Sequence, residues 1–187
     1  MKVLETVLPG VLIIEPKVFP DARGFFVETY QKERYQSMGI APEFVQDNVS
    51  FSAKNVLRGV HSQNPHPQGK LVQVLQGAVW DVAVDIRRNS PHFGHRTAVT
   101  LTSETKNQFY IPPGFAHGFC VLSDTALFAY KCTDIYFPGN EVGFRWDDSE
   151  VGIQWPVEKP LLSLKDIALP LLREVAPEQL PAYNNRI

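Results

Sequence analysis

The sequence has few of the features that mark secreted, membrane or nucleic-acid-binding proteins. Its only two cysteines, Cys120 and Cys132, form no CxxC pair and lie in apolar, strand-like segments, so we expect buried thiols. No apolar run approaches the roughly 20 residues of a membrane span, and the start of the chain lacks the apolar core of a signal peptide. The net charge of −2 gives no sign of a surface for nucleic acid or anionic lipid. We therefore expect a cytoplasmic protein with no nucleic-acid or membrane partner.

Linkers, repeats and helix signals are also scarce. A length of 187 residues without a Gly/Ser-rich linker predicts one domain over residues 1–187. The clearest strand pattern is Lys70–Arg87, where apolar and polar residues alternate from Trp80 onward and Gly77 supplies a turn. Further strand-like runs, separated by turn residues, are Thr97–Leu101, Gln108–Ile111, His117–Leu122 and Ala126–Tyr136.

Two short helices are expected, at Lys32–Met38, which Gly39 would end, and at Leu169–Val175. Many short strands at this spacing favour a sandwich or a small jelly-roll barrel. The predicted fold class is therefore mainly β, a jelly-roll barrel with a few short peripheral helices. A barrel of this size holds one small ligand in its mouth.

The segment Asn55–Gln63 (NVLRGVHSQ) carries two candidate functional side chains, Arg58 and His61. They would lie on opposite faces of a regular strand, unless Gly59 marks a bulge that re-aims one of them. A lone histidine in a strand is more often structural than catalytic, so this segment does not assign a function by itself.

The segment Ile111–Phe119 (IPPGFAHGF) delivers His117 at the start of a strand after a rigid turn. Its P-x-G-x-x-H spacing resembles the second motif of cupin barrels, where the histidine is often a metal ligand. Metal-binding cupins usually carry H-x-H earlier in the chain, whereas this sequence has His61-Ser62-Gln63. Zinc or iron needs three or four suitable ligands, so we expect no metal.

Other segments are individually uninformative but occur in a distinctive order along most of the chain. They are EPKVFPDARGFFVETY (Glu15–Tyr30), FVQDN (Phe44–Asn48), NVLRGVH (Asn55–His61), QGKLVQV (Gln68–Val74), DVAVDIR (Asp81–Arg87), SPHFG (Ser90–Gly94), IPPGFAHGF (Ile111–Phe119), YKCTD (Tyr130–Asp134) and LSLKD (Leu162–Asp166). Taken together, these segments resemble the dTDP-4-dehydrorhamnose 3,5-epimerase family, which has a cupin-like jelly-roll fold.

The resemblance implies an isomerase that inverts C3 and C5 of a dTDP-4-keto-6-deoxy sugar in dTDP-L-rhamnose or related deoxysugar biosynthesis, without a cofactor. His61 would be the general base, and Asp166 would pair with it and fix its tautomer. Lys70 would stabilise the enolate oxygen. Tyr130 would return a proton on the opposite face of the sugar ring, as inversion requires.

The resemblance also implies a site for the nucleotide. Arg23 and Arg58 would lie near the diphosphate, where guanidinium geometry suits phosphate oxygens. The other implied contacts are aromatic faces for the base at Phe19 and Tyr136, polar contacts at Glu28, Gln46 and Asn48, and sugar-pocket residues His117 and Phe119. Family members are dimers whose N-terminal residues reach the neighbouring site, so a homodimer is expected.

Two departures from the family pattern leave alternatives open. Ser62 stands after the implied base where many relatives have an aromatic residue, and the loop Asn64–Gln68 is rich in proline and histidine. Inversion at C3 alone, or a ketoisomerase that moves the carbonyl, is one alternative. The others are a metal-dependent cupin enzyme that uses His61 and His117, and a non-catalytic sugar-nucleotide binder.

Overall fold

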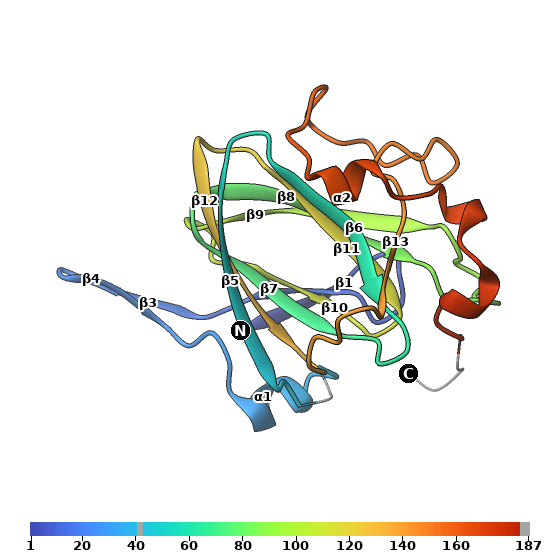
Figure 1. Cartoon of the computed structure of the whole chain (residues 1–187). Helices are drawn as coiled ribbons and strands as arrows, with labels where there is room; N and C mark the ends of the chain where they lie inside the picture. Colours follow the sequence, from blue (N-terminus) through green and yellow to red (C-terminus); the bar gives the residue numbers. More distant parts are fainter. Residues whose placement is uncertain (41–42, 184–187) are drawn as a thin grey trace.

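The computed structural model describes residues 1–40 and 43–183, whose strands form two large antiparallel sheets that face each other and a separate two-stranded hairpin (Figure 1). In spatial order, the six-stranded sheet contains β1 (Lys2–Glu5), β2 (Leu12–Glu15), β10 (Gln108–Ile111), β7 (Lys70–Gln76), β12 (Thr125–Cys132) and β5 (Gln46–Ala53). The five-stranded sheet contains β13 (Glu141–Gly143), β6 (Leu57–Gln63), β11 (Phe115–Val121), β8 (Ala78–Asp85) and β9 (Arg96–Thr102). The predicted mainly β jelly-roll fold is confirmed.

The run Lys70–Arg87 divides at Gly77 as predicted, and its two strands join different sheets. Gly77 has a φ of +82°, a conformation that glycine adopts readily, and a Cβ there would lie 2.2 Å from the Thr125 carbonyl oxygen. Both faces of β8 are covered, so Asp81 and Asp85 are fully buried. The alternation of apolar and polar residues along β8 therefore does not mark a solvent-exposed face.

Three apolar clusters hold the sheets and their flanking segments together. The main cluster fills the space between the sheets and includes Phe109 and Phe128 from one sheet and Phe119 from the other. A second joins the outer face of the five-stranded sheet to C-terminal residues such as Leu172. A third packs Tyr35, next to the six-stranded sheet, against residues such as Leu71. Burial of apolar area on this scale is the main stabilising term for such a fold.

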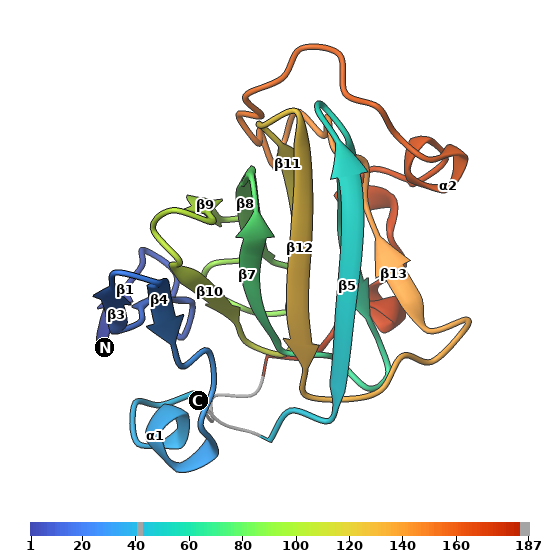
Figure 2. The same cartoon turned by 90° about the vertical axis from the view of Figure 1, so that its left-hand side faces the viewer.

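Part of the outer surface remains apolar and exposed. Strands β3 (Val18–Asp21) and β4 (Gly24–Val27) form a hairpin that projects away from the barrel (Figure 1), and Phe26 on it is 69% exposed. On β5, Phe51 points outward and is 62% exposed. Figure 2 shows β5 and β12 with no helix in front of them. Exposed apolar patches of this kind often mark interaction surfaces.

The helical elements are short and peripheral. They are α1 (Lys32–Gln36), α2 (Leu164–Ile167) and the 3-10 turns η1 (Leu172–Glu174) and η2 (Pro177–Gln179). The helix predicted at Lys32–Met38 is confirmed in α1. No helix of the described residues is long and apolar enough to cross a membrane.

The helix predicted at Leu169–Val175 is wrong, because only η1 forms within it. Pro170 disfavours a helical conformation at the preceding residue and has no amide hydrogen to donate. The amides that follow bond to side chains instead: Leu171 donates to Glu174 at 2.9 Å and Leu172 to Asp148 at 2.8 Å.

Candidate active site

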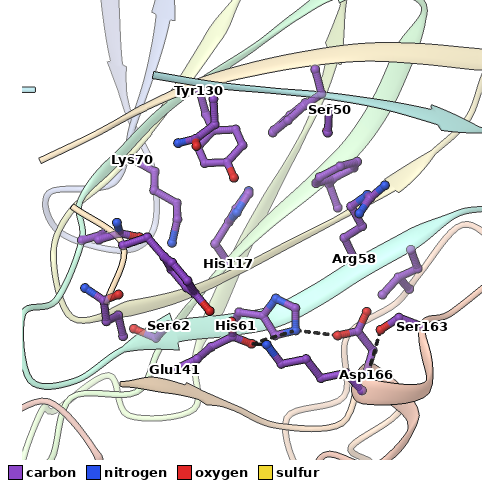
Figure 3. A pocket seen from close by; sticks show the side chains of 18 of the residues that line it. Ser50, Arg58, His61, Ser62, Lys70, His117, Tyr130, Glu141, Ser163 and Asp166 are labelled. Carbon is purple, nitrogen blue, oxygen red and sulfur yellow. Dashed lines mark hydrogen bonds and ion pairs between the residues drawn. The ribbon is translucent and has the colours of Figure 1, made fainter. Parts of the chain in front are cut away.

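A cavity of about 690 Å³ lies between the sheets. Its walls come from β5, β7 and β12 on one side, β6 and β11 on the other, and the segment that leads into α2. His61, Lys70, Tyr130 and Asp166, the four predicted catalytic residues, all line it (Figure 3). Residues that are as much as 105 positions apart in sequence are thus brought to one site.

A bulge in β6 brings both Arg58 and His61 to the cavity. In the pairing with β11, His61 lies opposite His117 and Arg58 lies opposite Phe119, so β6 holds one extra residue. Gly59 makes this possible, because it has a φ of +123° and a Cβ there would lie 2.6 Å from the Gly118 Cα. The bulge that the sequence suggested at Gly59 is confirmed.

His61 and Asp166 form a direct pair. The Nε2 atom of His61 lies 2.6 Å from Asp166 Oδ1, and the Asp166 side chain is only 5% exposed. Ser163, the N-cap of α2, accepts a hydrogen bond from the Asp166 amide and fixes its position. Since an ionised carboxylate can only accept at Nε2, the neutral imidazole carries its proton on that nitrogen and Nδ1 is the one that can act as a base.

The pair also determines the charge of Asp166. Burial alone would raise the pKa of Asp166, but the hydrogen bond from His61 and further favourable contacts hold that pKa below its ordinary value. Asp166 is therefore ionised at neutral pH and favours the imidazolium that forms when His61 takes a proton.

A second carboxylate, Glu141, lies beside the pair. Its Oε1 is 3.8 Å from His61 Nε2 and 2.6 Å from Lys165 Nζ. Neither Glu141 nor Lys165 could be identified from the sequence. Glu141 follows a Pro-Gly-Asn turn and shows no pattern of its own, whereas the antiparallel pairing of β13 with β6 brings it next to His61.

Lys70 extends into the cavity from β7. Burial lowers its pKa, while Cys132, Glu141 and Asp81 act in the opposite direction. An amine in this setting interacts most favourably with a ligand atom that develops negative charge close to it.

Tyr130 lies on the wall opposite His61, because β12 belongs to the six-stranded sheet and β6 to the five-stranded sheet. Figure 3 shows the phenol of Tyr130 and the side chain of Lys70 pointing from their wall toward His61. Burial raises the pKa of Tyr130, so its phenol is protonated at neutral pH and can donate a proton. A base and an acid thus face each other across the cavity.

His117 lines the cavity as predicted, and it has a partner that the sequence did not reveal. Its Nε2 lies 2.9 Å and 3.0 Å from the two carboxylate oxygens of Asp81. Burial raises the pKa of Asp81 and His117 acts against that shift. This pair holds the imidazole ring in place beside Phe128.

The predicted binding residues divide into two groups. The first group lines the cavity and consists of Gln46, Asn48, Arg58, His117, Phe119 and Tyr136.

The other group, Phe19, Arg23 and Glu28, does not line this cavity. Phe19 and Arg23 lie on the β3–β4 hairpin or its turn, where Arg23 pairs with Asp21 at 2.7 Å. Glu28 follows the hairpin and pairs with Arg34 at 2.8 Å.

Two observations, on Ser62 and on possible metal ligands, bear on the alternative functions that the sequence left open. Ser62 is 4% exposed, lines the cavity, and its Oγ has no hydrogen-bond partner among the described residues. In residues 1–40 and 43–183, no group of three or more His, Cys, Asp or Glu side chains is arranged to hold a metal ion.

Comparisons with known proteins agree with this geometry. Residues 5–174 match the family model described as dTDP-4-dehydrorhamnose 3,5-epimerase. The chain is 55% identical over 169 residues to a dTDP-4-dehydrorhamnose 3,5-epimerase of Shigella flexneri, covering 89% of this chain and 93% of the relative. It is 36% identical over 179 residues to a dTDP-4-dehydrorhamnose 3-epimerase of Streptomyces niveus, covering 94% and 86%.

A solved structure is also closely similar. The crystal structure of dTDP-6-deoxy-D-glucose-3,5-epimerase from Legionella pneumophila Philadelphia 1, in complex with dTDP-4-keto-L-rhamnose, is 51% identical with a TM-score of 0.95. The alignment covers 98% of each chain.

Proposed function

The chain belongs to the dTDP-4-dehydrorhamnose 3,5-epimerase family, and from this membership we propose that it inverts C3 and C5 of a dTDP-4-keto-6-deoxy sugar. The observation that carries the proposal is the His61–Asp166 pair facing Tyr130 across a cavity that also holds the Lys70 amine. Such an arrangement suits removal and return of a proton next to a ketone.

In each inversion, Nδ1 of His61 takes the proton from the carbon next to the C4 ketone. The electron pair of the broken C–H bond moves to the C4 oxygen, and Lys70 stabilises the resulting enolate. Tyr130 then donates its phenolic proton to the other face of that carbon. Water returns a proton to Tyr130 and takes one from His61, so the enzyme ends as it began.

We place the nucleotide along the open part of the cavity. Arg58 is held by a hydrogen bond from its Nε to Ser52 Oγ at 3.1 Å, which leaves its other guanidinium N–H groups for the diphosphate. Tyr136, which is 49% exposed, offers an aromatic face for the base, while Gln46 and Asn48 supply polar contacts. His117 and Phe119 line the sugar end.

We further propose a homodimer in which each protomer lends Phe19, Arg23 and Glu28 to the cavity of the other. The support is the projecting hairpin, which cannot serve its own cavity from its observed position (Figure 1). The exposed apolar side chains on the hairpin and on β5 are a further support, since a second copy would cover them.

The reaction is redox-neutral, so we propose that it needs no hydride carrier, and that it needs no metal. The Nε2 atoms of both cavity histidines, His61 and His117, are engaged by carboxylates. Dialysis against EDTA should leave the activity unchanged. A cytoplasmic location would suit the two buried, unpaired cysteines.

The deciding experiment is incubation with dTDP-4-keto-6-deoxyglucose in D₂O, with deuterium at C3 and C5 measured by NMR and mass spectrometry. We expect label and inversion at both carbons, both lost in His61→Ala. Label at C3 alone would identify a 3-epimerase, and label with a moved carbonyl a ketoisomerase. Tight dTDP binding without label would instead support a binding protein.

A further inference from the structure

The β6–β7 loop, Asn64–Gly69, lies against the segment Thr133–Asn140 between β12 and β13. The two are joined at several points along their length. The Gly69 amide donates to Thr133 Oγ1 at 2.7 Å, and the Asn64 amide donates to the Asn140 carbonyl at 2.8 Å. The second segment contains Tyr136, which lines the cavity.

Gln63 forms the centre of this contact. Its Nε2 donates to the carbonyl of Ile135 at 3.1 Å and to that of His66 at 2.7 Å, and its Oε1 accepts from the Phe137 amide at 2.8 Å. The side chain is 2% exposed. One buried carboxamide thus bonds main-chain groups on both sides of Tyr136.

Two further carboxamides complete the set. Gln68 Nε2 donates to the Asp134 carbonyl at 2.9 Å, and Gln46 Oε1 accepts from the Tyr136 amide at 2.8 Å. Main-chain groups of four consecutive residues, 134–137, are therefore bonded by side chains from three different parts of the barrel. These residues belong to no helix or strand, so hydrogen bonds to the carboxamides replace the main-chain hydrogen bonds that a strand would make.

The loop contributes packing as well. The ring of His66 stacks on Phe137 with centroids 4.4 Å apart, and its Nδ1 lies 3.4 Å from Asp134 Oδ2. His66 therefore contacts Asp134 and Phe137, the two residues that flank Ile135 and Tyr136.

We propose that Gln63 and Gln68 are positioning residues that preset Tyr136 as a wall of the nucleotide site. The identity of the ligand rests on the proposed function, whereas the ordering of the segment does not. An irregular segment that is already ordered loses less conformational entropy when a ligand binds. Removing the carboxamides should therefore weaken nucleotide binding without changing the proton-transfer residues.

The first test measures the order of the segment by hydrogen exchange of peptides that cover residues 133–140. In Gln63→Met, which keeps the length of the side chain, the amides of Tyr136 and Phe137 should exchange faster than in the wild type. Gln76→Met, the same change at an exposed position of β7, should leave them unchanged. Unchanged exchange in Gln63→Met would overturn the proposal.

The second test asks whether Gln63 acts through Tyr136. Calorimetry with dTDP should show a Kd about tenfold higher in Gln63→Met, as expected from loss of preorganisation. In a Tyr136→Ala background, the same substitution should weaken binding far less. Equal weakening in both backgrounds would indicate a general structural effect and overturn the proposal.

Kinetics separate this inference from the proposed function. Gln63→Met should raise KM and leave kcat nearly unchanged, because the proton-transfer groups are intact. A fall in kcat with unchanged KM would contradict the positioning role. If Gln63→Met does not fold, Gln68→Met removes one hydrogen bond and should give the same pattern more weakly. Failure of the wild type to label its substrate in D₂O would refute the proposed function alone.

Discussion

At the scale of single residues, the proposed inversion depends on where protons lie before the substrate arrives. In the neutral imidazole of His61, the proton lies on Nε2, which faces the Asp166 carboxylate, so Nδ1 is the nitrogen that can accept a proton. Burial raises the pKa of Tyr130, which keeps its phenol protonated. One wall therefore offers a base and the other an acid, without any prior proton transfer.

Tyr130→Phe should separate proton removal from inversion. His61 remains able to take the proton and to return it to the same face, so solvent deuterium should enter the substrate while net epimerisation falls roughly 10²–10⁴-fold. NMR of the recovered sugar nucleotide in D₂O measures both. Equal loss of label and of inversion would mean that Tyr130 is also needed for proton removal.

Asp166 should also affect acid stability. Its pKa in the folded protein lies below the ordinary value of 3.8 despite burial, because His61 donates to it. The unfolded chain therefore binds the proton more readily, so the stability that Asp166 contributes is present above about pH 4 and is lost as the pH falls through its folded-state pKa. Urea titrations between pH 6 and pH 3 should show a smaller loss of stability in Asp166→Asn than in the wild type.

Asp147→Asn is a matched control for that measurement. Asp147 also has a lowered pKa, through its hydrogen bond with Arg145, but this pair lies at the surface, with Asp147 36% exposed. Solvent screens such a pair, so its removal should change the pH dependence less. A larger effect from Asp147 than from Asp166 would contradict the interpretation.

The sequence predicted the four proposed catalytic residues through the family resemblance, but two carboxylates of the site were missed. Asp81 alternates with apolar residues on β8, a pattern that usually marks a solvent-exposed face, and both faces of this strand are covered. Glu141 reaches His61 only through the pairing of β13 with β6. A local sequence pattern shows neither that both faces of β8 are covered nor that β13 pairs with β6.

At the scale of elements, the bulge in β6 decides whether the site forms. Without the extra residue, Arg58 and His61 would lie on opposite faces of the strand. Gly59→Ala should destabilise the fold by about 3 kcal/mol, because the new Cβ would meet the main chain of Gly118 in a backbone conformation that alanine rarely adopts. Urea unfolding measures the loss.

Gly24→Ala separates the two causes of that loss. Gly24 has a similar φ of +136°, yet no atom lies within 4 Å of the Cβ that would be added. Gly24→Ala should therefore lower the free energy of unfolding by less than Gly59→Ala does, because backbone strain is its only cause. Equal losses would show that crowding at the bulge contributes nothing.

The strands were easier to predict than the segments around them. Period-two alternation and turn residues are local signals, so β7, β8, β9, β10 and β11 fall close to the expected runs. The run Ala126–Tyr136 ends as a strand at Cys132, because the following main-chain groups bond to glutamine side chains. Hydrogen-bond partners that are distant in sequence produce no periodic pattern from which the end of the strand could be predicted.

At the scale of the whole molecule, the cavity of one chain lacks residues that the family resemblance assigns to it. Arg23 lies near the tip of the projecting hairpin and Phe19 on its first strand (Figure 1). A second copy that receives this hairpin would cover exposed phenylalanines and bring Arg23 as a further cation for the diphosphate. The proposed dimer thus completes the site as well as burying apolar surface.

Mixed dimers should reveal the sharing directly. Arg23→Ala impairs the site of the partner, whereas His61→Ala inactivates the site of its own protomer. When the two variants are coexpressed in equal amounts, half of the dimers are hybrids and each has one intact site, so about a quarter of wild-type activity should return. A mixture of His61→Ala and Asp166→Asn should stay inactive, because both residues serve the same protomer's cavity. No recovery in the first mixture, with dimers formed, would mean that Arg23 does not act across the interface.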